Sequence, residues 1–299
     1  MRCLFTALVL GLSLPAGAAA FSAEESAAVL SHGPWPPPAR RDATNPVSGK
    51  PEAIALGERL FFEPRLSGTG SVLCATCHVP YRRFQDSRAR AFGLEETERN
   101  TPTLLDVGFY PRWGWEGARD SLWSQSIRPL LEPREMRSSP SQIGKFVRTY
   151  AAADYQRAFG RPPSASDAEI LSDVGKALAA YQETLVSART SFDAFRDALV
   201  RGDAAASAAY PPAAQRGLRV FLRACDSCHA GPTFSSGAIV GGYRVPALRS
   251  VAFTAPYMHD GRAATLREAV RHNSPELAPG EIDDVVAFLK SLTESNEPR

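Results

Sequence analysis

Apolar and polar residues follow a helical period in two corresponding parts of the chain. The segments AEILSDVGKALAAYQETLV (168–186) and GEIDDVVAFLKSLT (280–293) repeat apolar residues every three to four positions, which is typical of amphipathic helices. Few segments alternate with the two-residue period of a strand. The pattern predicts an all-α fold with long ordered loops, and 24 prolines and 22 glycines agree with many turns.

A second helical pattern occurs twice, each time ahead of a pair of cysteines. The segments AIALGERLFF and AAQRGLRVFL both contain a glycine followed four residues later by a phenylalanine, as Gly57 and Phe61 or as Gly217 and Phe221. This internal repeat predicts two helical domains, one over residues 21–190 and one over residues 191–299.

Two further segments contain histidines of interest. A short helix is predicted over TLREAVRHN (265–273), where Thr265 and Glu268 can form a capping box and His272 lies near the end. The arm HGPWPPPAR (32–40) has no periodic pattern. We expect its histidine, His32, to be exposed rather than to bind a metal.

The N-terminus has the features of an export signal. One arginine, an apolar run and the sequence AGAAA indicate a secretory signal peptide over residues 1–20. No later segment is apolar enough to span a membrane, so we expect a periplasmic protein without a membrane span after cleavage. The formal net charge of +2 argues against a nucleic-acid partner.

The cysteine pairs belong to two CxxCH motifs, CATCH (74–78) and CDSCH (225–229), which are attachment motifs of c-type haem. The histidines expected as proximal iron ligands are His78 and His229. Disulfides, zinc sites or thioredoxin-like pairs would leave the histidine that follows both pairs unexplained. The cysteines expected to bond the two haems are Cys74, Cys77, Cys225 and Cys228.

Together with these motifs, longer segments resemble the bacterial dihaem cytochrome c peroxidase/MauG superfamily. The segments are LFFEPRLSGTGSVLCATCH, RNTPTLLDV, GWEGARDSLWSQSIRPLLEPREM, YRVPALRSVAFTAPYMHDG and TLREAV. The resemblance extends over nearly the whole mature chain. It implies two cytochrome c-like helical domains, each with one covalent c-type haem.

The resemblance also implies roles for single residues. Glu135 corresponds to the distal acid of the N-terminal haem pocket, and Gln125 and Pro129 correspond to other positions of that pocket. Trp115 corresponds to the tryptophan between the haems. Taken alone, Trp115 is equally typical of a packed core and Glu135 of a solvated surface. A calcium ion between the domains would be bound by Asn100, Thr254 and the carbonyl of Pro256.

Two departures from the family pattern bear on the haem ligands. In many relatives the loop after the first CxxCH motif supplies a second histidine to the N-terminal haem and closes it. Here the loop 79–98 contains no histidine, so this haem is expected to be open to peroxide. In relatives the sixth ligand of the C-terminal haem is Met or Tyr, fourteen residues after the position of His259, and here that position is Asn273. The neighbouring His272 is the favoured ligand because imidazole suits iron, although one helix position turns a side chain by about 100°. A water-bound or open iron and His259 are the alternatives.

The resemblance implies an oxidoreductase that activates hydrogen peroxide at the N-terminal haem. It would use high-valent iron to oxidise a side chain of a periplasmic partner protein, with tryptophan as the expected target in the MauG-like branch, which includes the methanobactin-operon homologue. One alternative is a conventional dihaem cytochrome c peroxidase supplied with electrons by a small cytochrome or cupredoxin. Another is a non-enzymatic electron-transfer cytochrome. Dihaem peroxidases often dimerise, so a homodimer is a further expectation.

Overall fold

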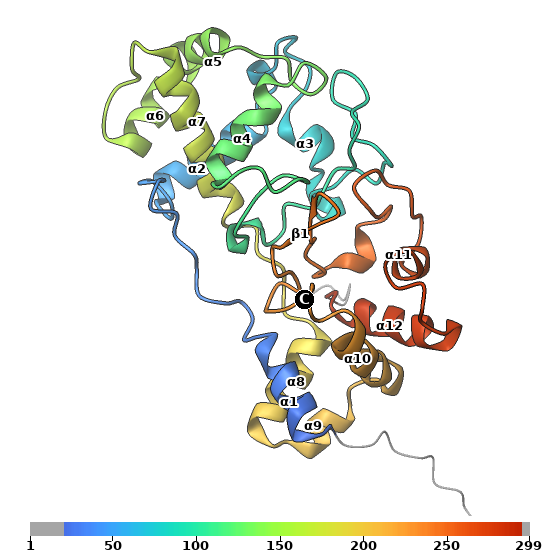
Figure 1. The fold of residues 1–299 in the computed structure, drawn as a ribbon. Coiled ribbons are helices and arrows are strands. Elements are labelled where there is room, and N and C mark those ends of the chain that lie inside the picture. Colours follow the sequence, from blue (N-terminus) through green and yellow to red (C-terminus); the bar gives the residue numbers. More distant parts are fainter. Residues whose placement is uncertain (1–20, 295–299) are drawn as a thin grey trace, which may run out of the picture.

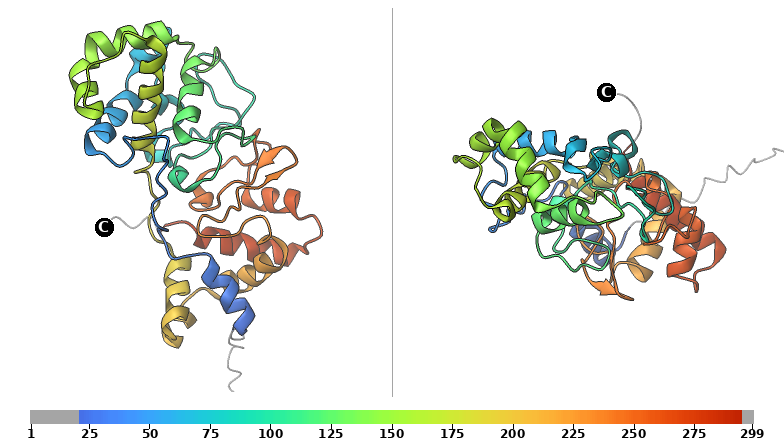
Figure 2. Two further views of the ribbon diagram at one scale, coloured as in Figure 1. Left: turned by 60° about the vertical axis from the view of Figure 1, so that its left-hand side comes forward. Right: turned by 90° about the horizontal axis from the view of Figure 1, so that it is seen from above.

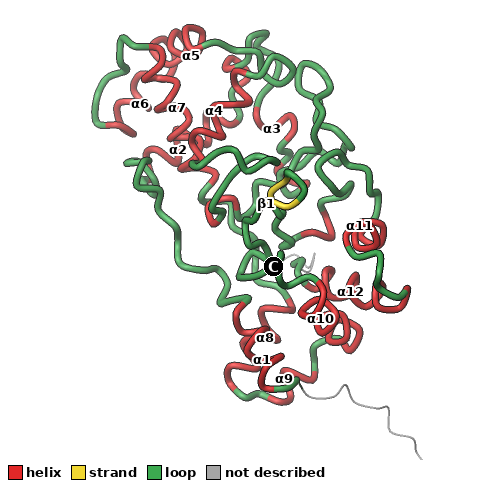
Figure 3. The backbone as a smooth tube through the Cα atoms, viewed as in Figure 1, coloured by secondary structure: helices red, strands yellow, loops and turns green. Residues whose placement is uncertain are grey.

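The computed structural model describes residues 21–294, and the signal-peptide prediction for residues 1–20 lies outside this range. Helices dominate the described residues, and long loops connect them (Figures 1 and 3). The first group of α-helices is α1 (Ala23–Ser31), α2 (Pro51–Phe61), α3 (Cys74–Cys77), α4 (Leu122–Leu131), α5 (Pro140–Phe146), α6 (Ala152–Phe159) and α7 (Asp167–Gln182). The second group is α8 (Ser191–Arg201), α9 (Ala204–Ala208), α10 (Pro212–Ala224), α11 (Leu266–Asn273) and α12 (Pro279–Ser291).

The remaining regular elements are short. Strands β1 (Ile239–Val240) and β2 (Tyr243–Arg244) pair as an antiparallel hairpin, and a π-helical turn, Val147–Ala151, joins α5 to α6. The 3₁₀ turns are Pro64–Leu66, Pro80–Arg82, Val107–Phe109 and Val251–Phe253. The predicted helix-rich fold with few strands is therefore confirmed over the described residues.

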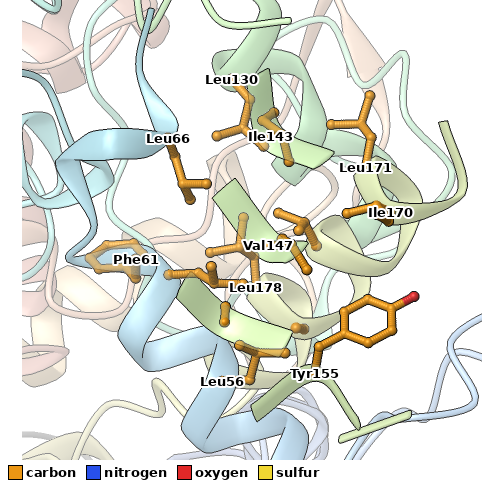
Figure 4. Packing of buried hydrophobic residues seen from close by; sticks show 14 of the residues in the cluster. Leu56, Phe61, Leu66, Leu130, Ile143, Val147, Tyr155, Ile170, Leu171 and Leu178 are labelled. Atoms are coloured by element: carbon orange, nitrogen blue, oxygen red, sulfur yellow. The ribbon is translucent and has the colours of Figure 1, made fainter. Parts of the chain in front are cut away.

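The predicted amphipathic helices form the centres of two separate cores. In the first core, α7 packs against α2, α4 and α5 through residues such as Leu56, Leu130 and Leu178 (Figure 4). In the second core, α12 packs against α10 and α11 through residues such as Phe221 and Phe288. Each core lies beside one CxxCH motif, since Cys74 packs against the first core and Cys225 against the second.

The repeated glycines explain how closely these helices cross. A Cβ atom at Gly57 would overlap the Ala177 carbonyl oxygen of α7, and a Cβ atom at Gly217 would overlap the Asp284 carbonyl oxygen of α12. Both positions therefore require glycine for the same reason, which is close approach of two helix backbones. The repeat seen in the sequence corresponds to a repeated packing arrangement.

The N-terminal segment connects the two cores. Helix α1 packs against α8 and α10, so Val29 belongs to the second core although it precedes the first core in sequence. The segment after α1 then runs along the molecule to α2 (Figures 1 and 2). A third, smaller apolar cluster, which includes Val107, Tyr110 and Leu122, lies against Ala247 and links the loops of the two halves.

Candidate active site

The two CxxCH histidines have the same local geometry. His78 Nδ1 lies 3.0 Å from the Phe84 carbonyl oxygen, and His229 Nδ1 lies 2.9 Å from the Phe234 carbonyl oxygen. Both phenylalanines have a positive φ angle, 56° and 55°, which turns the loop back toward the histidine. With Nδ1–H donating to a carbonyl, Nε2 keeps its lone pair for a metal.

The electrostatic surroundings also suit neutral ligands. Burial lowers the pKa of both His78 and His229, and burial raises the pKa of Cys74 and Cys77 to about 12. The four described cysteines are free thiols rather than disulfides. They are therefore available for thioether bonds to haem vinyl groups.

A cavity lies against the first motif. Its lining residues are Phe61, Val72, Leu73, Cys74, Cys77, His78, Gly93, Leu104, Gln125, Ser126, Pro129, Glu135, Met136, Leu178 and Gln182. The cavity thus brings together the motif and all three pocket residues that the resemblance implied on α4 and the turn after it.

One polar atom of this cavity has no protein partner. Gln125 Oε1 is buried and accepts no hydrogen bond within the described structure. A buried polar atom without a partner is costly and indicates that something else occupies the space beside it. The apolar wall, the two thiols and the histidine fit a haem, and the amide could bind a small polar molecule beside it.

Helix α4 positions this side of the cavity. Ser121 caps the helix by accepting a hydrogen bond from the Ser124 N–H, and Ser126 accepts a hydrogen bond of 3.0 Å from Gln182 of α7. Pro129 lies inside the helix, which ends at Leu131. Glu132, which follows the last helical residue, directly precedes Pro133 and is extended, with ψ of 124°. Because a residue before proline disfavours the helical conformation, the helix stops there and the chain turns Glu135 back toward the cavity.

Glu135 is held beside Arg128, a residue that the sequence did not indicate. Arg128 Nη1 donates to Glu135 Oε1 at 3.0 Å, and the carboxylate is 24 % exposed. Burial raises the pKa of Glu135, Arg128 opposes that rise, and Glu132 adds to it. A carboxyl group with a raised pKa can exchange protons near neutral pH more readily than a surface acid.

A cluster of three ring side chains connects the loops of the two halves. Trp115 Nε1 donates to the Asn100 carbonyl oxygen at 2.8 Å, and its ring lies edge-on to His259 with centroids 6.5 Å apart. His259 also stacks on Tyr243 at 3.8 Å. His259 therefore lies between two aromatic rings, and Trp115 packs at the contact between the halves.

The residues proposed for calcium are near this contact. The Asn100 N–H donates to the His259 carbonyl oxygen at 2.8 Å, and its side-chain amide donates to the Arg88 carbonyl oxygen at 2.6 Å. Thr254 Oγ1 donates to the Val251 carbonyl oxygen at 3.2 Å. Calcium binding by Asn100, Thr254 and Pro256 stays a prediction.

Helix α11 begins with the predicted capping box, and its last residue lies beside an unexpected side chain, that of Met258. The Thr265 side chain accepts from the Glu268 N–H, as expected. His272 is exposed, whereas the Asn273 amide nitrogen donates to the Ala269 carbonyl oxygen and lies 3.9 Å from the Met258 sulfur. For His272 to take the position of Asn273, the last turn of α11 would have to rotate by about 100°. The Met258 sulfur is a second candidate iron ligand here, and no local sequence pattern indicates it.

The prediction that His32 is exposed is wrong. His32 is fully buried, with Nδ1 3.0 Å from the Gly231 carbonyl oxygen and Nε2 2.8 Å from Asp226 Oδ1. Its ring stacks on Phe234 at 4.4 Å. The packing of α1 against the second core brings His32 behind the CDSCH motif, and this long-range contact leaves no periodic signal in the arm.

Residues 51–203 match the family model described as di-haem cytochrome c peroxidase. The chain belongs to this family. Methylamine utilization protein MauG of Methylorubrum extorquens is 34% identical, and the match covers 83% of this chain and 79% of that protein. Cytochrome c551 peroxidase of Pseudomonas aeruginosa is 28% identical, with 82% and 79% covered.

Solved structures agree with this assignment. A MauG-like protein associated with microbial copper homeostasis superposes with a TM-score of 0.70 at 25% identity and covers 96% of both chains. The diheme peroxidase BthA from Burkholderia thailandensis has a TM-score of 0.69 at 22% identity, over 86% of this chain and 87% of that chain, and this likeness shows the fold alone.

The predicted family is thus confirmed, and the chain is an oxidoreductase of the dihaem peroxidase type. Membership supports two haems. Over residues 21–294, none of the helices combines the length and apolar character needed to cross a bilayer.

Proposed function

We propose that this protein activates hydrogen peroxide at a haem held by Cys74, Cys77 and His78 and oxidises a side chain of a partner protein, with tryptophan as the target. A second haem would be held by Cys225, Cys228 and His229. We further propose that the mature protein works in the periplasm after removal of residues 1–20, with calcium between its halves and a homodimer as its assembly.

The observation that carries this proposal is the cavity beside the first motif. Of the described residues that line it, His78 is the single histidine, and Gln125 and Glu135 are on the wall formed by α4 and the turn after it. A cavity lined by a CxxCH histidine, an amide and a carboxyl group that can exchange protons would suit a small substrate such as peroxide. The relation to MauG of Methylorubrum extorquens supports the protein-oxidising branch.

When bound, the haem supplies the iron that binds peroxide and stores oxidising equivalents. Glu135 would accept the proton from one peroxide oxygen and return it to the other, which then leaves as water. Gln125, whose Oε1 has no protein partner, would accept a hydrogen bond from the peroxide or from the water formed. Arg128 would keep the Glu135 carboxyl group oriented.

Electrons must enter from outside this site. Reduction of one peroxide to two waters consumes two protons and two electrons, and the partner side chain would lose those electrons. Trp115, which packs against His259 at the contact between the halves, would supply an aromatic ring on the route between the two motifs.

For the second haem we propose His272 as the sixth ligand, reached by rotation of the last turn of α11. Met258 is the competing donor, because its sulfur lies 3.9 Å from the Asn273 amide. A methionine ligand would raise the haem potential and favour the second candidate function, a conventional peroxidase that draws electrons from a small cytochrome.

The two functions can be separated with the loaded protein and peroxide. One reaction contains a reduced small cytochrome c, and the other contains a secreted, tryptophan-bearing candidate partner protein. We expect oxidation of a partner tryptophan, detected by mass spectrometry, and slow oxidation of the cytochrome. Fast cytochrome turnover with an unmodified partner would establish the conventional peroxidase instead.

A further inference from the structure

Two arginines are buried in the described structure, and they differ in their partners. Arg249 is 2 % exposed and forms a two-point ion pair with Asp193, at 2.8 and 3.0 Å. Arg244 is 8 % exposed, and no described acid lies within 4.0 Å of it. Because arginine does not lose its proton in proteins, Arg244 carries a buried positive charge without a countercharge.

The contacts that Arg244 does make are weak ones for a cation. Its guanidinium lies 4.5 Å from the ring centroid of Tyr110, and Nη1 donates to the neighbouring Val245 carbonyl oxygen at 3.3 Å. Nε is buried and has no hydrogen-bond partner. A cation–π contact is worth about 0.5–2 kcal/mol, whereas taking an ion out of water costs several kcal/mol. The described contacts of Arg244 therefore do not offset the cost of burying its charge.

The backbone places Arg244 beside the second haem motif. The Arg244 N–H donates to the Trp115 carbonyl oxygen at 2.7 Å, and the next residue, Val245, bonds the loop at Ala238. The Pro246 carbonyl group, two residues further, faces His229. The segment 244–246 thus extends from Trp115 to the proposed iron ligand.

We propose that Arg244 binds a propionate carboxylate of the haem held at Cys225 and Cys228. A propionate is the anionic group that a haem carries at its edge, and a guanidinium offers donors in a geometry that matches a carboxylate. Bound in this way, Arg244 places a fixed positive charge beside that haem and links its edge to the Trp115 loop. The proposal rests on the proposed haem assignment.

The direct test is a crystal structure of the loaded protein. We expect a propionate oxygen of the second haem within hydrogen-bond distance of the Arg244 guanidinium. A guanidinium that binds only water, a solvent anion or the first haem would overturn the assignment. Haem content is measured first. A chain without haem at Cys225 and Cys228 would contradict the proposed function. A fully loaded chain in which Arg244 has a different partner would contradict this inference alone.

Reduction potentials give an independent readout. Arg244→Leu should lower the reduction potential of one haem, because loss of a nearby positive charge stabilises the ferric state relative to the ferrous state. Arg244→Lys should retain most of the wild-type reduction potential. Arg112→Leu is the matched control, since Arg112 is exposed and its Cβ atom flanks the same glycine, Gly117, as that of Arg244. Unchanged potentials in Arg244→Leu, or an equal shift in Arg112→Leu, would contradict the proposal.

Discussion

Replacement of Glu135 by glutamine should slow the reaction with peroxide by about 10²–10⁴-fold, which is the usual contribution of a general acid–base group. In free energy this is about 3–5 kcal/mol of barrier. Glutamine keeps the size of the side chain but cannot carry a proton from one peroxide oxygen to the other. The carboxylate is 24 % exposed and its partner Arg128 is 46 % exposed, so loss of the ion pair should cost about 1 kcal/mol of stability or less.

The assay is stopped-flow absorbance of the loaded ferric protein mixed with peroxide. Glu132→Gln is the matched control, because Glu132 also approaches Arg128, at 3.9 Å, but does not line the cavity. We expect rates close to wild type for Glu132→Gln, because Glu132 is a minor cause of the raised pKa of Glu135 after burial, and two haems per chain in both variants. A Glu135→Gln variant with wild-type kinetics would refute the role assigned to Glu135, and equal losses in both variants would assign the effect to Arg128.

Three further substitutions test other parts of the structure. Gly217→Ala should lower the melting temperature by about 2–8 °C, since overpacking costs about 1–3 kcal/mol. Gly280→Ala is the control and should not lower it, because no atom lies within 4 Å of the new Cβ atom. Equal melting temperatures of the two variants would contradict the close helix crossing. Burial raises the pKa of Asp106 from 3.8 to about 6, so the folded state binds its proton more tightly than the unfolded chain, and stability should fall as pH rises through this range. Asp106→Asn should flatten that decline in thermal melts, and an unaltered pH profile would exclude Asp106 as its source. His272→Ala should abolish the low-spin electron paramagnetic resonance (EPR) signal of the second haem, and an unaltered signal would show that His272 is not the ligand.

The helices and their repeat could be predicted from the sequence because local periodicity determines them. The structure places α7 at Asp167–Gln182, a few residues shorter than the predicted segment, since Thr184 turns the chain by donating to the Tyr181 carbonyl oxygen. The glycines before each motif carried a recognisable signal, and the structure shows that both permit close contact between helix backbones.

The loops were less accessible to prediction, because tertiary contacts rather than local patterns determine their conformation. His32 is buried by packing of α1 on the second core, and Met258 approaches Asn273 only through the fold. The ion pair of Arg128 with Glu135 spans seven residues around Pro129 and has no periodic signature. Arg244 resembles any surface arginine in the sequence, and only its burial without an acid distinguishes it.

We propose that the haem held at His78 is open to peroxide, with Gln125 and Glu135 beside it. EPR spectroscopy of the loaded ferric protein tests this claim most directly. We expect a high-spin ferric signal from the His78 haem, alongside a low-spin signal from the His229 haem, and loss of the high-spin signal when peroxide is added. Two low-spin signals that do not respond to peroxide would contradict it.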